Sequence, residues 1–117
     1  MTVKECYDIM GADYAGVESR LRTEERIKKF LLKVLNDKSY GLLCSSIEQN
    51  NMEEAFRAAH TLKGISQNLS LTTLYESSSA LSEQLRENQQ YNKEVEQLFE
   101  QVKKDYAHIT ETIQNLL

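Results

Sequence analysis

The most chemically suggestive group in the sequence is a histidine followed closely by a lysine and a glycine: His60, Lys63 and Gly64. A neutral imidazole, with an ordinary pKa of about 6.5, has a free ring nitrogen at neutral pH and forms covalent intermediates as a nucleophile. In a helix, a lysine three residues further on lies beside the histidine, and its ammonium would offset negative charge added to the ring. A histidine with these neighbours could therefore hold an anionic group, such as a phosphoryl group, on its ring.

The segment from Met52 to Leu69 is predicted to be a helix with His60 on its outer face. If Leu62 points to the core, then at about 100° per residue His60 points about 160° away from it. The residues on the side of Leu62 form the predicted buried stripe: Ala55, Ala58, Ala59, Ile65, Ser66 and Leu69. The residues around His60 are Glu53, Phe56, Arg57, Lys63, Gly64 and Gln67. We expect Glu53, Phe56 and Arg57 to contact a partner protein.

Gly64 needs a reason, since glycine inside a helix costs about 1 kcal/mol relative to alanine. It does not face the predicted core, so internal packing does not require it. A glycine there would leave space beside His60 for a partner backbone or a bulky group. Phe56, four residues before His60, either offers a ring that a partner buries or lies partly buried at the edge of the stripe. Gln67 either donates a hydrogen bond to a group on His60 or is a plain surface residue.

Apolar residues recur at helical spacing along most of the chain, which has no proline and four glycines. The apolar stripes run over Ile27–Leu35, Leu42–Ile47, Met52–Leu69, Leu71–Leu85 and Tyr91–Leu116, with Leu42, Leu43 and Tyr91 expected to point inward. Because short polar turns join these segments, the fold class is predicted to be all-α, an antiparallel four-helix bundle. The break at Asn36–Ser39 separates the first two pieces.

The N-terminal part, residues 1–22, is predicted to be a short helical segment packed across one end of the bundle. Gly11 interrupts it, and Asp13 is a candidate N-cap for a second short helix. The chain is expected to be a single domain, with this lid followed by a bundle over about residues 24–116.

The charge and composition exclude several classes of partner. The net charge is −4 and no basic run stands out, so neither nucleic acid nor a membrane surface is an expected partner. The N-terminus has no apolar stretch typical of a signal peptide. Cys6 and Cys44 are well separated and are expected to be reduced thiols. Together these features predict a cytoplasmic protein, which we expect to be a monomer.

The chain offers no sign of metal or cofactor chemistry. Its histidines and cysteines lack metal-ligand spacing, so no metal and no cofactor is expected. The sequence contains no glycine-rich nucleotide loop, so the protein is not expected to phosphorylate itself from ATP. His108 lies between Tyr106 and Ile109 without a lysine-glycine companion, and it is interpreted as a structural or surface residue.

The run Ala59-His60-Thr61-Leu62-Lys63-Gly64, followed by Ile65 to Leu69, resembles the signature of histidine-containing phosphotransfer (HPt) domains. The resemblance extends to the four-helix layout and covers roughly residues 24–116. It implies that His60 is phosphorylated, on its outer ring nitrogen, with Lys63 near the phosphoryl group and Gly64 giving clearance. It also implies a phosphocarrier and not an enzyme, with receiver domains of hybrid histidine kinases and response regulators as partners.

Two positions depart from the family pattern. The small residue usual after the glycine is Ile65 here, and the glycine common soon after the signature is Ser70. Ile65 is expected to be a core variation, and Ser70 is expected to change how the helix ends. Two other functions stay open: a helical interaction module that binds a receiver or kinase domain without carrying phosphate, and a phosphatase acting on a receiver.

Overall fold

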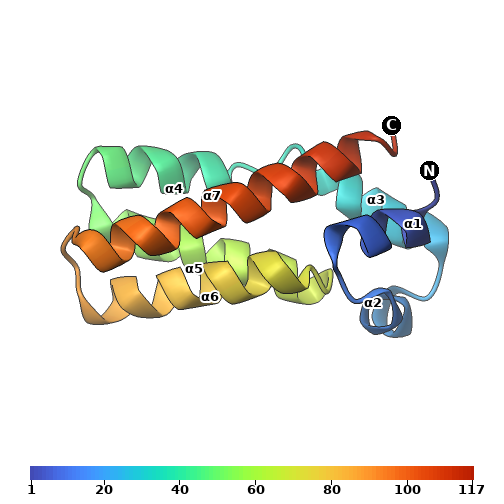
Figure 1. Cartoon of the computed structure of the whole chain (residues 1–117), viewed down its shortest axis with the longest axis horizontal. Helices are drawn as coiled ribbons and strands as arrows, with labels where there is room; N and C mark the ends of the chain where they lie inside the picture. Colours follow the sequence, from blue (N-terminus) through green and yellow to red (C-terminus); the bar gives the residue numbers. More distant parts are fainter.

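The computed structural model describes residues 1–117, which form seven α-helices and no strand (Figure 1). The helices are α1 (Val3–Met10), α2 (Tyr14–Leu21), α3 (Glu24–Val34), α4 (Ser39–Glu48), α5 (Met52–Asn68), α6 (Thr72–Glu87) and α7 (Lys93–Gln114). The all-α prediction is therefore confirmed.

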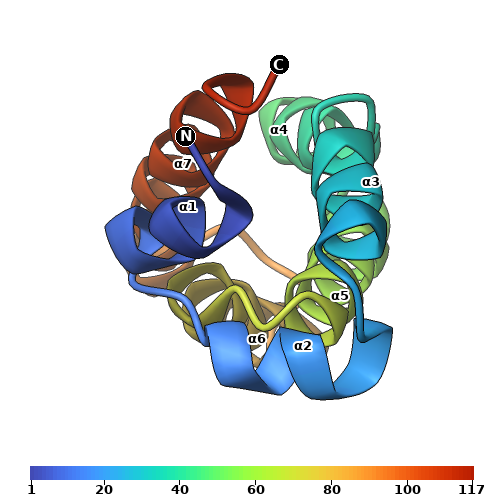
Figure 2. The ribbon, with the colours of Figure 1, turned by 90° about the vertical axis from the view of Figure 1, so that its right-hand side faces the viewer.

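The bundle consists of α5, α6, α7 and the pair α3 and α4, which follow each other along one side (Figure 1 and Figure 2). Short connections reverse the chain from α4 to α5, from α5 to α6 and from α6 to α7. Between α3 and α4 the chain breaks without reversing, and the Ser39 amide donates a 2.8 Å hydrogen bond to the Asp37 carboxylate there. The rings of Tyr40 in α4 and Tyr106 in α7 stack with centroids 3.9 Å apart. This contact joins α4 to α7, the last helix, within the predicted antiparallel four-helix bundle.

The N-terminal helices α1 and α2 lie at one end of the bundle, as predicted (Figure 2). Helix α1 packs against α7 and α3. It ends at Gly11, whose φ of 65° is the left-handed conformation that glycine adopts readily. Asp13 caps α2, since its Oδ1 accepts a 3.1 Å hydrogen bond from the Gly16 amide. His108 in α7 places its Nε2 3.0 Å from the carbonyl oxygen of Ile9, which links α7 to α1.

One apolar core extends through the bundle and under the N-terminal helices. Two side chains expected to point inward do not: Leu42 is 53% exposed and Tyr91 is 45% exposed. Leu43 takes the inward position of α4, and its neighbour Leu42 is turned by about 100° from it. Tyr91 precedes Asn92, the N-cap of α7, so it lies outside the helix whose stripe it was predicted to extend.

Candidate functional site

The candidate site is built on α5, whose start is well capped. The Asn51 side chain accepts a 3.2 Å hydrogen bond from the Glu54 amide, which satisfies one of the free N–H groups of the first turn. Glu53 and Glu54 place negative charge at the positive end of the helix dipole. These interactions begin the helix eight residues before His60, so His60 lies in its regular interior.

The inner face of α5 holds the helix in the bundle. Leu62 is 1% exposed, and Ala55 and Ala59 are fully buried. The buried Ser66 hydroxyl donates a 2.9 Å hydrogen bond to the Leu62 carbonyl. The predicted stripe is therefore correct for these residues and for Ala58 and Leu69, and it places the opposite face of α5 in solvent.

His60 lies on that opposite face and is exposed. Its ring makes no hydrogen bond within the protein, and its nearest aromatic neighbour is Phe56, with ring centroids 5.9 Å apart and planes 27° apart. Both ring nitrogens are therefore open to an incoming group, and one side of the imidazole is flanked by an aromatic ring.

Phe56 is half-buried and packs against the core. Its ring therefore lies partly buried at the edge of the apolar stripe, one of the two positions considered for it. The Arg86 guanidinium of α6 lies 5.7 Å from the centroid of its ring, a cation–π distance. Phe56 thus joins α5 to α6 while part of its ring stays accessible beside His60.

Glu53 and Arg57 are both exposed, and they contact each other. Arg57 Nη2 lies 2.8 Å from Glu53 Oε1, and Arg57 also contacts the Glu54 carboxylate. Exposed pairs at this helical spacing contribute about 0.5 kcal/mol or less, because water screens them and the side chains lose freedom. The charge of the Arg57 guanidinium is therefore partly neutralised by Glu53 and Glu54. Because these ion pairs are weak, Arg57 can leave them for a carboxylate of a partner protein.

Lys63 and Gly64 share the outer face with His60. Lys63 is half-buried, and its ammonium forms no ion pair within the protein. A Cβ added to Gly64 would meet no atom within 4 Å. Nothing inside the molecule therefore requires glycine here, and the space beside it is open.

Gln67 is exposed, and together with Gly64 it lines an open hollow on α5. The other residues that line it are Asn68 and Arg20, and Arg20 comes from α2. Arg20 was not predicted to be near this face. No periodic signal links positions so far apart in the chain, so only the packing of α2 against the end of α5 reveals it.

The end of α5 is fixed by the N-terminal helices. The Tyr7 hydroxyl donates a 2.7 Å hydrogen bond to the Leu69 carbonyl, and the Asp13 amide donates a 3.0 Å hydrogen bond to the Ser70 carbonyl. Ser70 has a φ of 55°, the left-handed region where glycine is favoured. Ser70 therefore ends α5 in the conformation that a glycine would adopt, so the expected change in how the helix ends is not seen in its backbone.

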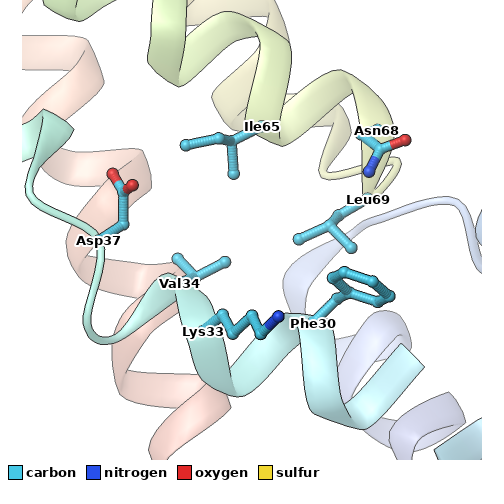
Figure 3. A pocket seen from close by; sticks show the side chains of 7 residues that line it. All are labelled: Phe30, Lys33, Val34, Asp37, Ile65, Asn68 and Leu69. Atoms are coloured by element: carbon cyan, nitrogen blue, oxygen red, sulfur yellow. The ribbon is translucent and has the colours of Figure 1, made fainter. Parts of the chain in front are cut away.

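A second cavity lies between α5 and α3 (Figure 3). Ile65 of α5 and Leu69, the residue that follows this helix, face Phe30 and Val34 of α3 across it. Ile65 is half-buried and lines this cavity, so the expectation of a core position for it is only partly correct. The volume of this cavity, about 190 Å³, is below the range typical of small-molecule and cofactor pockets.

The rest of the molecule adds no cluster of three or more His, Cys, Asp or Glu side chains that could hold a metal ion. None of the seven helices combines the length and the apolar character that crossing a bilayer requires.

Comparison with known proteins gives one finding. The family model described as Hpt domain matches residues 25–116. The matched range contains all of α5 and leaves out α1 and α2. No curated protein and no solved structure matches the chain.

Proposed function

Because the chain belongs to the Hpt domain family, which serves histidine phosphotransfer in two-component signalling, we propose that it carries a phosphoryl group on His60. One observation carries this proposal: His60 is exposed and without hydrogen bonds, on the same helix face as a glycine whose missing side chain leaves open space. His108, the other histidine of the chain, is bound to the Ile9 carbonyl and lacks such surroundings.

The proposed reaction moves the phosphoryl group between an aspartate of a receiver domain and His60. The lone pair of His60 Nε2 forms the N–P bond while the acyl phosphate P–O bond breaks, and the aspartate leaves as a carboxylate. The other ring nitrogen keeps its proton. Transfer in the opposite direction passes the group to a second receiver. Such transfer depends mainly on positioning and charge stabilisation, much of which the receiver and its metal ion would supply.

Three residues of α5 support the phosphoryl group in this proposal. Lys63, which has no ion-pair partner, offsets the negative charge of the phosphoryl oxygens. Gly64 leaves room for the receiver backbone to approach. Gln67 is exposed on the same face and is available to donate a hydrogen bond.

Glu53, Phe56 and Arg57 form the proposed docking residues on the N-terminal side of His60. The partly open Phe56 ring offers apolar surface, and the weak Glu53–Arg57 pair can be exchanged for contacts with the partner. Receiver domains of hybrid histidine kinases and of response regulators are the proposed partners. The protein is proposed to be a cytoplasmic monomer that carries the phosphoryl group without catalytic machinery of its own. Residues 1–117 are proposed to form one domain.

The test is transfer of labelled phosphate from a phosphorylated receiver domain to the protein. We expect a label that is lost in acid and stable in base on the parent protein and on a His108→Gln control, and none on His60→Gln. A His60→Gln protein labelled as fully as the parent would exclude the carrier function at this residue. A parent protein that binds the receiver without ever becoming labelled would instead indicate the interaction module.

A further inference from the structure

Arg20, which lies outside the residues matched by the family, binds the C-terminal end of the histidine helix. Its Nε donates a 3.2 Å hydrogen bond to the Asn68 carbonyl, and its Nη2 donates a 3.1 Å hydrogen bond to the Gln67 carbonyl. Nη2 also lies 3.1 Å from the Asn68 carbonyl oxygen and contacts the Ser70 hydroxyl. Since the last carbonyls of a helix have no partners within it and carry its negative dipole end, a guanidinium there is stabilising.

Gly16 lies where α2 approaches the turn that ends α5. A Cβ at this position would lie 2.9 Å from the Ser70 hydroxyl oxygen and 2.5 Å from Asp13 Oδ2. Since both atoms are side-chain ends, a larger residue there would displace the Ser70 hydroxyl and the Asp13 cap. The left-handed Ser70, where the family commonly has glycine, is held by the same guanidinium that binds the helix end. Arg20 therefore has a fixed position relative to α5.

Part of the Arg20 guanidinium remains unused. A guanidinium has five N–H donors in a rigid plane, and the two on Nη1 have no partner within the protein. Arg20 also forms no ion pair. It lines the hollow with Gly64, Gln67 and Asn68, and no acidic residue lines that hollow. The hollow therefore combines open space, a fixed positive charge and two free donors, the chemistry that binds a carboxylate.

The surrounding chain strengthens this positive charge. Residues 13–38, which span α2 with its cap and α3, contain seven Lys or Arg and five Asp or Glu, a net charge of +2 in a chain whose net charge is −4. The segment that carries α2 and α3 is thus positive on balance, and the rest of the chain is negative. An acidic partner surface would be attracted to this segment.

The hollow is close enough to His60 for one partner to cover both. Gly64 follows His60 by four residues, about 6 Å along the helix axis. A protein interface of standard size buries roughly 800 Å² on each partner, a patch roughly 30 Å across. Asn68, whose carbonyl Arg20 binds, follows His60 by eight residues, about 12 Å along the axis, so a patch of this size centred on His60 extends to Arg20.

We propose that Arg20 is a docking residue: its Nε and Nη2 groups hold the end of α5, while its Nη1 group receives a carboxylate of the receiver domain in the hollow. This proposal rests on the proposed function. The hollow presents a guanidinium and no acidic residue, so its charge is complementary to a carboxylate on the docked receiver.

The experiment measures the second-order rate of phosphoryl transfer from a phosphorylated receiver as a function of salt concentration. Arg20→Gln keeps an N–H donor for the α5 carbonyls and removes the charge, whereas Arg20→Lys keeps the charge and loses the planar fork. We expect Arg20→Gln to reduce the rate about three- to tenfold at low salt, with little difference at high salt, and Arg20→Lys to keep most of the salt dependence. Lys104→Ala in α7, diagonally across the bundle from α5, is the control with the same change in net charge.

Other outcomes would overturn this proposal in distinct ways. If Arg20→Gln has the same salt dependence as the parent, Arg20 is only a helix cap. If Arg20→Gln and Arg20→Lys slow transfer equally at every salt concentration, its role is to shape α5 and not to bind a carboxylate. A parent protein that takes no label at all would instead contradict the proposed function itself.

Discussion

The Tyr7 hydroxyl and the Leu69 carbonyl, separated by 62 residues in the sequence, are joined by a buried hydrogen bond of 2.7 Å. Tyr7 is fully buried, and its ring also makes an edge contact with Tyr14, with centroids 5.8 Å apart. The bond gives the carbonyl at the C-terminus of α5 a partner that the helix itself cannot supply. The N-terminal helices are thus part of the structure that holds the histidine helix, and their contribution can be measured.

Tyr7→Phe removes this hydrogen bond with little change in shape. We expect the free energy of unfolding to fall by about 1–3 kcal/mol, because the Leu69 carbonyl stays buried without a partner. Urea denaturation measures the change. Tyr75→Phe is the matched control, since Tyr75 is half-buried and its hydroxyl makes no hydrogen bond within the protein. Equal stabilities for the two variants would mean that the Tyr7 bond contributes nothing.

Gly64→Leu tests the open space beside His60. We expect folding to be unimpaired, because leucine favours the helix by about 1 kcal/mol over glycine and no atom lies within 4 Å of the new Cβ. Transfer from a phosphorylated receiver should fall by at least about a hundredfold, the scale of loss when a reacting group is displaced by about 1 Å. Circular dichroism checks the fold, and labelling of His60 checks the transfer.

Gly41 provides a matched control for this variant. It is also an exposed glycine inside a helix, α4, with no atom within 4 Å of an added Cβ. Gly41→Leu should therefore resemble Gly64→Leu in stability and retain transfer. If both variants transfer at the parent rate, clearance at Gly64 is not needed.

Lys63→Ala tests the charge beside His60. We expect transfer to slow by about fivefold, which corresponds to about 1 kcal/mol for one partly exposed charge interaction. The unfolding free energy should stay within about 0.5 kcal/mol of the parent value, because Lys63 has no ion-pair partner to lose. Single-turnover transfer and urea denaturation give the two numbers. A large loss of stability with unchanged transfer would assign Lys63 a structural role.

Alkaline pH should destabilise the protein through its buried thiol and tyrosines. Burial raises the pKa of the Cys6 thiol from 9.0 to about 11, and burial also raises the pKa of Tyr7. Between these pH values the unfolded chain has released the thiol proton and the folded chain keeps it, so the free energy of unfolding falls as pH rises from 9 to 11. Tyr40 and Tyr106, whose pKa values burial also raises, contribute in the same direction.

Urea denaturation at several pH values from 8 to 10.5 measures this effect. Cys6→Ala should show a shallower decline than the parent, because it removes one of the groups that bind a proton only in the folded state. Parallel curves for the two proteins would show that Cys6 does not contribute.

Helical periodicity explains how much of this molecule could be predicted from its sequence. The repeat of small and apolar residues around Leu62 orients α5, and that orientation places His60 and Gly64 in solvent without any knowledge of the other helices. Capping residues such as Asp13 similarly indicate where α2 begins. Each of these inferences depends only on residues within a few turns of one another.

Apart from the outward orientations of Leu42 and Tyr91, which are set locally, the features that could not be predicted depend on contacts between distant segments. Ile65 is half-buried because it lines the cavity between α5 and α3, and Arg20 reaches the end of α5 from α2, far away in the sequence. The sequence shows that Ser70 departs from the family pattern, but its left-handed conformation and its contact with Arg20 are visible only in three dimensions. The pattern of residues along one helix does not indicate which residues from distant segments will contact it.

The bonds from Tyr7, Asp13 and Arg20 to the end of α5 also bear on how the protein should be trimmed or fused. A fragment cut to the family boundary at residue 25 would retain every group proposed to touch phosphate, and it would lose all three of these donors. Its histidine helix would then be expected to fray from the C-terminal end. Weak transfer by such a fragment would reflect the choice of boundary and not the chemistry of His60.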